Sequence, residues 1–138
     1  MFSVDHVRAA ASAGQIDFGE NRVQEAQQKI AGSSALGLRW HLVGHLQSNK
    51  ARRAAAEFHM IQSVDSARLV ALLDDAALAE KRQVEVLVQV DLAGEPTKHG
   101  ALPGDVMSIL AEARGRRGVA VRGLMIVPPA ADDPEGAR

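Results

Sequence analysis

The chain has 138 residues and a formal net charge of −1, and 46% of its residues are hydrophobic and 24% charged. This length favours a single domain with a real core, and the near-neutral charge gives no electrostatic reason to expect nucleic acid or a membrane surface as a partner. The absence of cysteine excludes disulfides, a thiolate nucleophile and a cysteine-based zinc site, and it is compatible with a reducing, cytoplasmic setting. Asp5, His6 and Arg8 interrupt any signal-peptide core, and no apolar run approaches the roughly 18 residues of a membrane-spanning helix.

Helical and extended segments alternate along the chain. Apolar residues at helical spacing predict helices over about 4–13, 21–32, 48–58, 66–81 and 102–114. Extended stretches between them predict strands over 15–19, 38–44, 59–64, 84–92 and 119–127. Gly14 is the predicted stop of the first helix, and Ser48 and Asp65 are the predicted N-caps of the third and fourth helices. The run over 84–92 is rich in β-branched residues, which predicts a strand buried on both faces.

About five strands, each preceded by a helix, predict an α/β fold with a parallel sheet and right-handed crossovers. Periodicity leaves two architectures open, a doubly wound sheet or an arc of a (β/α)8 barrel. A barrel arc would expose two unpaired sheet edges. We expect the domain to cover residues 1–129, and we expect residues 130–138, which are small and acidic, to form a loose tail.

The densest polar cluster, over 18–25, lies at a predicted junction between a strand and a helix. Ligands of α/β folds bind at the carboxyl ends of parallel strands, so Glu20 and Asn21 stand where a site is expected. The competing interpretation is structural. In that case Asn21 caps the next helix, while Glu20 and Glu25 favour its N-terminal dipole.

A second cluster, over 40–50, contains two histidines whose spacing invites a metal interpretation. Such a pair binds zinc best on a helix, whereas His41 and His45 span a predicted strand end and no acidic residue lies within the segment. We therefore expect His41 to be a partly buried histidine with satisfied hydrogen bonds, and His45 to lie in a loop. Lys50 stands in a polar helix start that suits either anion binding or simple solvation.

Two further segments follow predicted strands. Residues 91–100 form a polar loop that contains Lys98, and its glycine and proline content fits either a functional loop or an ordinary turn. Met125 stands near the end of the last strand, where methionine is more often core filler than ligand contact. The sequence contains no dinucleotide-binding glycine motif, phosphate-binding loop or nucleophile elbow.

Four strings in order carry a family resemblance: FGENRVQEA, WHLVGHLQSNKAR, Lys98-His99-Gly100 and RGLMIVPP. Together they resemble the pyridoxal phosphate homeostasis (YggS-like) proteins, which share a barrel with the N-terminal domain of alanine racemase. The resemblance runs from about Phe2 to Pro129 and implies the barrel architecture, here a partial (β/α)8 barrel. It also implies pyridoxal 5′-phosphate (PLP) as the cofactor and PLP-dependent apoenzymes as candidate partners.

The same resemblance assigns cofactor-binding residues. It places Asn21 beside the cofactor, and His41 and Met125 at matching strand ends. It places Lys50 and Lys98 at the rim of the pocket. No residue of this chain is assigned a catalytic role by these matches.

The family holds PLP as a Schiff base on a lysine at the end of the first barrel strand, and it binds the phosphate through a Ser- and Gly-rich loop. By the resemblance, the lysine would fall at or just before Met1 and the loop after Arg138. We therefore expect a chain truncated at both ends, without the Schiff-base lysine or the phosphate loop. We also expect no covalent PLP adduct.

Three functions follow from these arguments. The first is a PLP-binding protein that acts as a non-catalytic carrier or regulator. The second is a remnant without a cofactor, which the exposed sheet edges favour. The third, an amino-acid racemase-type enzyme, needs two opposed acid/base groups, and the related racemase uses a tyrosine that this sequence does not contain.

Overall fold

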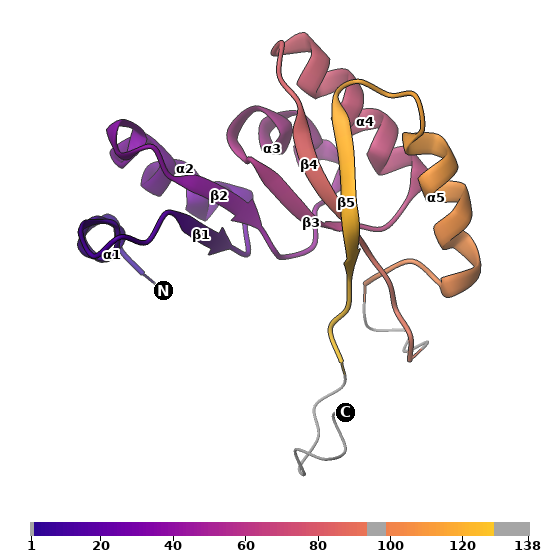
Figure 1. The fold of residues 1–138 in the computed structure, drawn as a ribbon, viewed down its shortest axis with the longest axis horizontal. Helices are drawn as coiled ribbons and strands as arrows, with labels where there is room; N and C mark the ends of the chain where they lie inside the picture. Colours follow the sequence, from indigo (N-terminus) through magenta and orange to yellow (C-terminus); the bar gives the residue numbers. More distant parts are fainter. Residues whose placement is uncertain (1, 94–98, 129–138) are drawn as a thin grey trace.

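The computed structural model describes residues 2–93 and 99–128 (Figure 1). Helices and strands alternate in the order α1 Val4–Ser12, β1 Asp17–Glu20, α2 Val23–Gly32, β2 Arg39–Leu42, α3 Ala51–Glu57, β3 Met60–Val64, α4 Ala67–Ala79, β4 Val84–Gln89, α5 Val106–Ala113 and β5 Val119–Met125. Three short 3₁₀ helices lie between them, η1 Ser34–Leu36, η2 Ser48–Lys50 and η3 Pro103–Asp105. The predicted tail over 130–138 and Lys98 lie outside the described residues. Within the described ranges, no helix has both the length and the apolar character to span a bilayer.

The strands form one sheet in the order β1-β2-β3-β4-β5, and each neighbouring pair is parallel. A doubly wound sheet reverses its strand order at a switch point, whereas a barrel adds each strand beside the previous one. The strictly sequential order therefore selects the barrel arc, which periodicity alone left open. The predicted α/β fold with a helix before each strand is confirmed.

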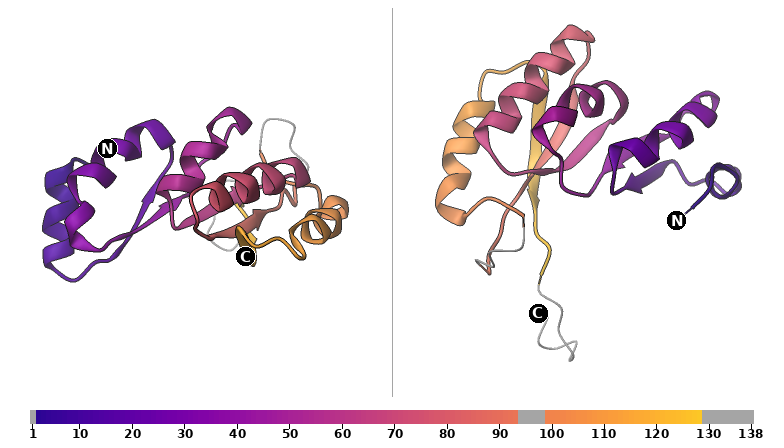
Figure 2. Two further views of the ribbon diagram at one scale, coloured as in Figure 1. Left: turned by 90° about the horizontal axis from the view of Figure 1, so that it is seen from above. Right: turned by 180° about the vertical axis from the view of Figure 1, so that it is seen from behind.

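One face of the sheet is covered by helices. Turned by 180°, the molecule shows α2, α3, α4 and α5 in front of the strands (Figure 2), and consecutive helices pack against each other. Leu42, Ile61 and Val86 point from three neighbouring strands into this covered face and are fully buried. Phe58, Leu73 and Ile109 meet them from the helix side. The core is thus a single layer between sheet and helices.

The opposite face, which we call the open face, carries polar and half-exposed side chains. Along β4, buried Val84, Val86 and Val88 alternate with Glu85 and Leu87, which are only partly buried. The prediction that this segment is buried on both faces is therefore wrong. The β-branched run reflects packing against helices on one side only.

The helix ends correct two predicted caps. Ser66, not Asp65, is the N-cap of α4, and its hydroxyl accepts a hydrogen bond from the Leu69 amide at 3.1 Å. Ser48 lies inside η2 and caps nothing, since the N-cap position of α3 is Lys50. Gly14 follows α1 with φ of 103°, a left-handed conformation that glycine adopts without strain, which confirms the predicted stop.

A buried ion pair joins β1 to α2. Lys29 Nζ lies 2.6 Å from Glu20 Oε1, and the two side chains are only 7% and 11% exposed. Glu20 therefore points toward the helix layer, and its charge serves the fold. Removing one partner of such a pair leaves an uncompensated buried charge, which costs far more than the pair itself contributes.

We expect Lys29→Met to lower the free energy of unfolding by about 3–5 kcal/mol, measured by urea denaturation. Lys81→Met, at an exposed lysine after α4, is the control and should change it by no more than about 0.5 kcal/mol. The double variant Glu20→Gln/Lys29→Met should recover much of the loss, because no charge is then left buried. A single variant as stable as the control would contradict this interpretation.

The surroundings of His59, which precedes β3, disfavour its protonated state. Its Nδ1 atom accepts a hydrogen bond from the Trp40 amide at 3.0 Å. Burial, and then the positive charges of Arg82 and Arg39, lower the pKa of His59 below its usual value of 6.5. The unfolded chain therefore binds a proton at His59 more readily than the folded chain does. The stability that neutral His59 contributes is fully present above the unfolded pKa and is lost as the pH falls below it.

The variant His59→Asn tests this, because the asparagine oxygen can accept the Trp40 amide in place of Nδ1 and does not titrate. We expect the free energy of unfolding of the parent to fall more steeply than that of the variant as pH drops below 6.5. Denaturant titrations at several pH values measure both slopes. Parallel curves would show that His59 does not contribute to the pH dependence of the free energy of unfolding.

Candidate functional site

The loops after β1, β2, β4 and β5 meet at the carboxyl end of the sheet. Between them lies a cavity of about 350 Å³, which we call the strand-end hollow. It is lined by Asn21, Val43, Gly44, His45, Gln89, Val90, Asp91, His99 and Val127. Parallel α/β sheets bind ligands at this end, so the hollow is the candidate site.

The first wall of the hollow depends on one glycine. A Cβ atom built on Gly44 would lie 2.1 Å from the carbonyl oxygen of Asn21. No side chain fits there, so the loop after β2 can approach the loop after β1 this closely only with glycine at position 44. The contact fixes where Asn21 stands relative to His45.

Asn21 does not cap the following helix. The N-cap position of α2 is Arg22, which makes no side-chain capping hydrogen bond. The side chain of Asn21 is exposed, and within the described ranges its amide has no hydrogen-bond partner. The structural interpretation of Asn21 as a cap is therefore wrong, and the amide is available to a ligand.

The opposite wall comes from the loop after β4. The rings of His45 and His99 stack with centroids 3.6 Å apart and planes within 8°. Gln89 Nε2 donates to the carbonyl oxygen of His99 at 3.3 Å, and the Gly100 amide donates to Asp65 Oδ2 at 3.3 Å. Three contacts thus hold the end of this loop against β2, β3 and β4.

Lys50 lies in a neighbouring cavity of about 370 Å³ at the start of α3. Asn21 and His45 line both cavities, so the two are adjacent. Arg22 lines this second cavity too and pairs with Glu25 at 3.8 Å, whereas within the part of the chain that the structure describes Lys50 has no ion-pair partner. The second cavity therefore has a positive rim that suits an anion.

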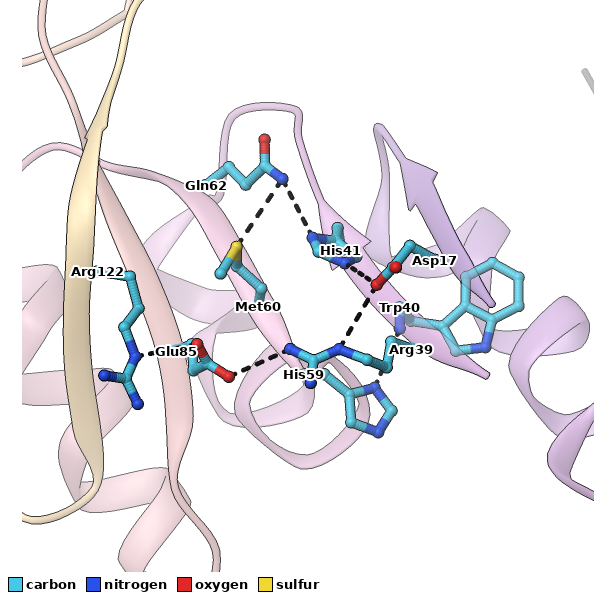
Figure 3. A network of polar contacts seen from close by, with 9 residues as sticks. All are labelled: Asp17, Arg39, Trp40, His41, His59, Met60, Gln62, Glu85 and Arg122. Atoms are coloured by element: carbon cyan, nitrogen blue, oxygen red, sulfur yellow. Dashed lines mark hydrogen bonds and ion pairs between the residues drawn. The ribbon is translucent and has the colours of Figure 1, made fainter. Parts of the chain in front are cut away.

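His41 lies in the middle of β2 on the open face, in a polar network that crosses the sheet (Figure 3). Its Nε2 atom lies 2.9 Å from Asp17 Oδ1, and its Nδ1 atom lies 3.1 Å from Gln62 Nε2. Because the Gln62 amide can only donate, Nδ1 accepts and Nε2 carries the proton toward Asp17. The expectation of a partly buried, satisfied histidine is confirmed.

Arginine and carboxylate side chains continue this network. Arg39 joins Asp17 at 3.5 Å to Glu85 at 3.1 Å, and Arg122 reaches the other oxygen of Glu85 at 3.0 Å. The hydrogen bond from Arg39, followed by that from Arg122, lowers the pKa of Glu85 below its usual 4.5. Glu85 therefore stays charged between two guanidinium groups.

His41 and His45 do not converge on a common point. His41 bonds to Asp17 and Gln62, while His45 stacks on His99. Over residues 2–93 and 99–128, no three histidine or acidic side chains are grouped to hold a metal ion.

The family model for the alanine racemase N-terminal domain matches residues 2–138. The chain belongs to the alanine racemase N-terminal domain family. This confirms the resemblance and the barrel architecture that it implied.

Among relatives of this family, the chain is similar to two pyridoxal phosphate homeostasis proteins. The protein of Haemophilus influenzae is 33% identical, over 94% of this chain and 56% of its own length. That of Mycobacterium bovis is 41% identical, over 86% of this chain and 54% of its own length. The chain thus spans about half the length of the curated relatives it matches.

Solved structures give the same result. PipY of Synechococcus elongatus with PLP bound has a TM-score of 0.85 and 42% identity, over 93% of this chain and 59% of that chain. Alanine racemase of Clostridium difficile has a TM-score of 0.73, over 89% of this chain and 31% of that chain, at only 13% identity. The second likeness shows the shared barrel fold alone.

The residues that the family resemblance assigned are partly brought together. Asn21 and Lys50 share the second cavity, while His41 lines a shallower one on the open face. Met125 ends β5, where its carbonyl oxygen accepts from the Val90 amide at 2.9 Å, and its side chain does not line the strand-end hollow. Lys98 lies outside the described residues.

Sequence reasoning missed three polar residues of these surfaces. Gln89 stands at the end of an apolar run, and a polar residue at the end of such a strand is a signal that could have identified it. Asp17 and Gln62, the partners of His41, carried no signal, because strand pairing alone brings them beside it.

We expect Gly44→Ala to displace the loop that carries Asn21 and to cost about 1–3 kcal/mol of unfolding free energy, because the added methyl group overlaps a backbone oxygen. Gly104→Ala is the matched control, since its Cβ would meet no atom within 4 Å. Thermal unfolding compares the two. Equal melting temperatures would show that the close approach does not constrain the site.

Proposed function

We propose that this chain binds PLP at the strand-end hollow and the adjoining second cavity, and acts without catalysis as a carrier or regulator of PLP homeostasis. The observation that carries the proposal is the likeness to PipY, whose structure holds PLP, at 42% identity across 93% of this chain. The relatives named pyridoxal phosphate homeostasis proteins support the same role.

The chemistry of the two cavities fits the parts of PLP. A phosphate dianion needs cations and backbone donors, and the second cavity offers Lys50, Arg22 and the amino terminus of α2. The unpartnered amide of Asn21 would hydrogen-bond a polar group on the pyridine ring. When bound, PLP supplies a reactive aldehyde and an electron-withdrawing ring.

The lysines of the described residues favour reversible binding. The amine of Lys29 is buried and paired with Glu20, so no aldehyde can reach it. Lys81 follows α4 at the amino end of the sheet, the end opposite the loops that form the strand-end hollow. Lys50 is the described lysine beside the hollow, and we assign it to the anion. The recipients of the cofactor would be PLP-dependent apoenzymes.

A racemase-type reaction has less support. It requires acid/base groups on both sides of the substrate carbon, and the sequence has no tyrosine to provide the one that the related racemase uses. The alanine racemase structures share 13% identity with this chain, which bears on the fold alone. Binding without catalysis is therefore the function we propose.

Titration of the purified chain with PLP, followed by the absorbance of the cofactor in equilibrium dialysis, tests the proposal. We expect saturable binding that Lys50→Met weakens about tenfold, the effect of losing one charge-assisted contact. Asn21→Ala should weaken it by a smaller factor. Lys81→Met, which removes the same charge far from the hollow, should leave the affinity unchanged.

Borohydride treatment before mass spectrometry separates reversible from covalent binding. We expect the intact mass to remain at 14.7 kDa, because no described lysine offers a free amine inside the hollow. A reduced adduct on Lys50 would overturn the reversible mode while preserving PLP binding. Absence of saturable binding would overturn the function itself.

A further inference from the structure

Two histidines that stack on each other border the strand-end hollow. The rings of His45 and His99 lie face to face, with centroids 3.6 Å apart and planes within 8°. His45 belongs to the loop after β2 and His99 to the loop after β4, and both residues line the hollow. The stack therefore joins two loops at the carboxyl end of the sheet.

The backbones of these two loops are anchored separately. β3 lies between β2 and β4 in the sheet, and no backbone hydrogen bond among the described residues joins the two loops. On one side, Gly44 packs against the carbonyl oxygen of Asn21. On the other side, Gln89 donates to the carbonyl oxygen of His99 at 3.3 Å. The ring stack thus connects two backbones that are each held in place without it.

Both rings can take up a proton from solvent. His45 and His99 are exposed, and within the described ranges their ring nitrogens have no hydrogen-bond partner that would hold one of them unprotonated. Imidazole changes its charge between about pH 5 and pH 8. The pair therefore passes through states with no proton, one proton and two protons as the pH falls.

The stack is compatible with one added proton and is opposed by two. A charged imidazolium ring can stack on a neutral ring, as cations do on aromatic faces. Two charged rings with centroids 3.6 Å apart repel each other even in bulk water. Each proton therefore affects the binding of the other, and the two rings titrate as a pair.

Carboxylates face the pair from the side of His99. Asp91 lines the hollow together with His99. Asp65 follows β3 and accepts a hydrogen bond from the Gly100 amide, next to His99, at 3.3 Å. Negative charge on these groups favours the uptake of a proton by His99.

Cations face the pair from the side of His45. Lys50 and Arg22 line the adjoining second cavity together with His45. Glu25 lies 3.8 Å from Arg22 and offsets part of its charge. The cations add to the repulsion that opposes a second proton on the pair.

We propose that the His45–His99 stack is an acid-sensitive contact of the strand-end hollow. With no added proton or with one, the rings stack and join the loops after β2 and β4. With two, the rings separate while each backbone stays anchored, and the hollow loses the border that the rings form. The inference concerns the hollow itself and stands whether or not PLP binds there.

NMR signals of the histidine ring protons, followed in the full chain without PLP from about pH 8.5 to about pH 4.5, test the coupling. The variant His99→Phe keeps a ring in the stack and removes one titrating group. We expect the second proton of the parent pair to bind at least about fivefold more weakly than the proton that His45 takes up in His99→Phe. His45→Phe gives the same comparison for His99. His6, an exposed histidine on α1, is the internal reference and should titrate alike in all three proteins.

A nuclear Overhauser effect between the two rings reports the contact itself. We expect this effect in the parent near neutral pH and its loss once both rings are protonated. In His99→Phe, the effect between the two rings should persist in acid, because only one charge forms. Circular dichroism at both pH values establishes that each protein remains folded.

Two results would overturn the inference. If His45 in the parent and in folded His99→Phe takes up its proton with equal affinity, and His99 does the same in the reciprocal comparison, the rings do not sense each other. If the Overhauser effect is absent near neutral pH, or survives when both rings of the folded parent are protonated, the stack is not a contact that acid breaks.

Discussion

The structure depends on a polar network that crosses the open face of the sheet. Five parallel strands bury their other face under helices, so polar side chains gather on the open face, where they pair with each other. Asp17, His41 and Gln62 do so on β1, β2 and β3, and Arg39 continues the chain of contacts to Glu85 and Arg122 on β4 and β5. Each pair is modest alone, but a network in which charges share partners holds its members in fixed geometry. The strand register and the network therefore define each other.

Successive side chains of a strand point to opposite faces, which explains why two adjacent residues of one motif have different roles. Glu20, the last residue of β1, points toward the helices and pairs with Lys29 in the interior. Asn21 follows on the loop, where the close approach of Gly44 holds its backbone and leaves its amide free. The acidic residue of the motif thus attaches α2 to the sheet, while the amide of Asn21 lies at the rim of the cavity that Lys50 also lines. Fold stability and ligand contact are divided between neighbours.

The sequence predicted the alternation of helices and strands, since hydrophobic periodicity and glycine stops are local signals. It could not choose between barrel and doubly wound sheet without the family strings, because strand order is a long-range property. It placed Asn21 and Lys50 near a site, but it left open a second interpretation of Asn21 as the N-cap of α2. In the structure that N-cap position is occupied by Arg22. The partners of His41 were not predictable, because the strand register decides which side chains lie beside it. The burial of Lys29 was not predictable either, because it depends on which face of α2 packs against the sheet.

Arg39 connects the open face of the sheet to its amino end. It belongs to the open-face network through Asp17 and Glu85, and its charge, after burial and Arg82, also lowers the pKa of His59, which precedes β3. His41, whose ring is bound to Asp17, contributes to the same lowering in smaller measure. Any change that neutralises Glu85 would leave the positive charge of Arg39 less compensated and would favour neutral His59 further. The network that closes the open face thus adds, after burial and the charge of Arg82, to the causes that lower the pKa of His59, while the Trp40 amide bound to Nδ1 leaves the ring proton on Nε2.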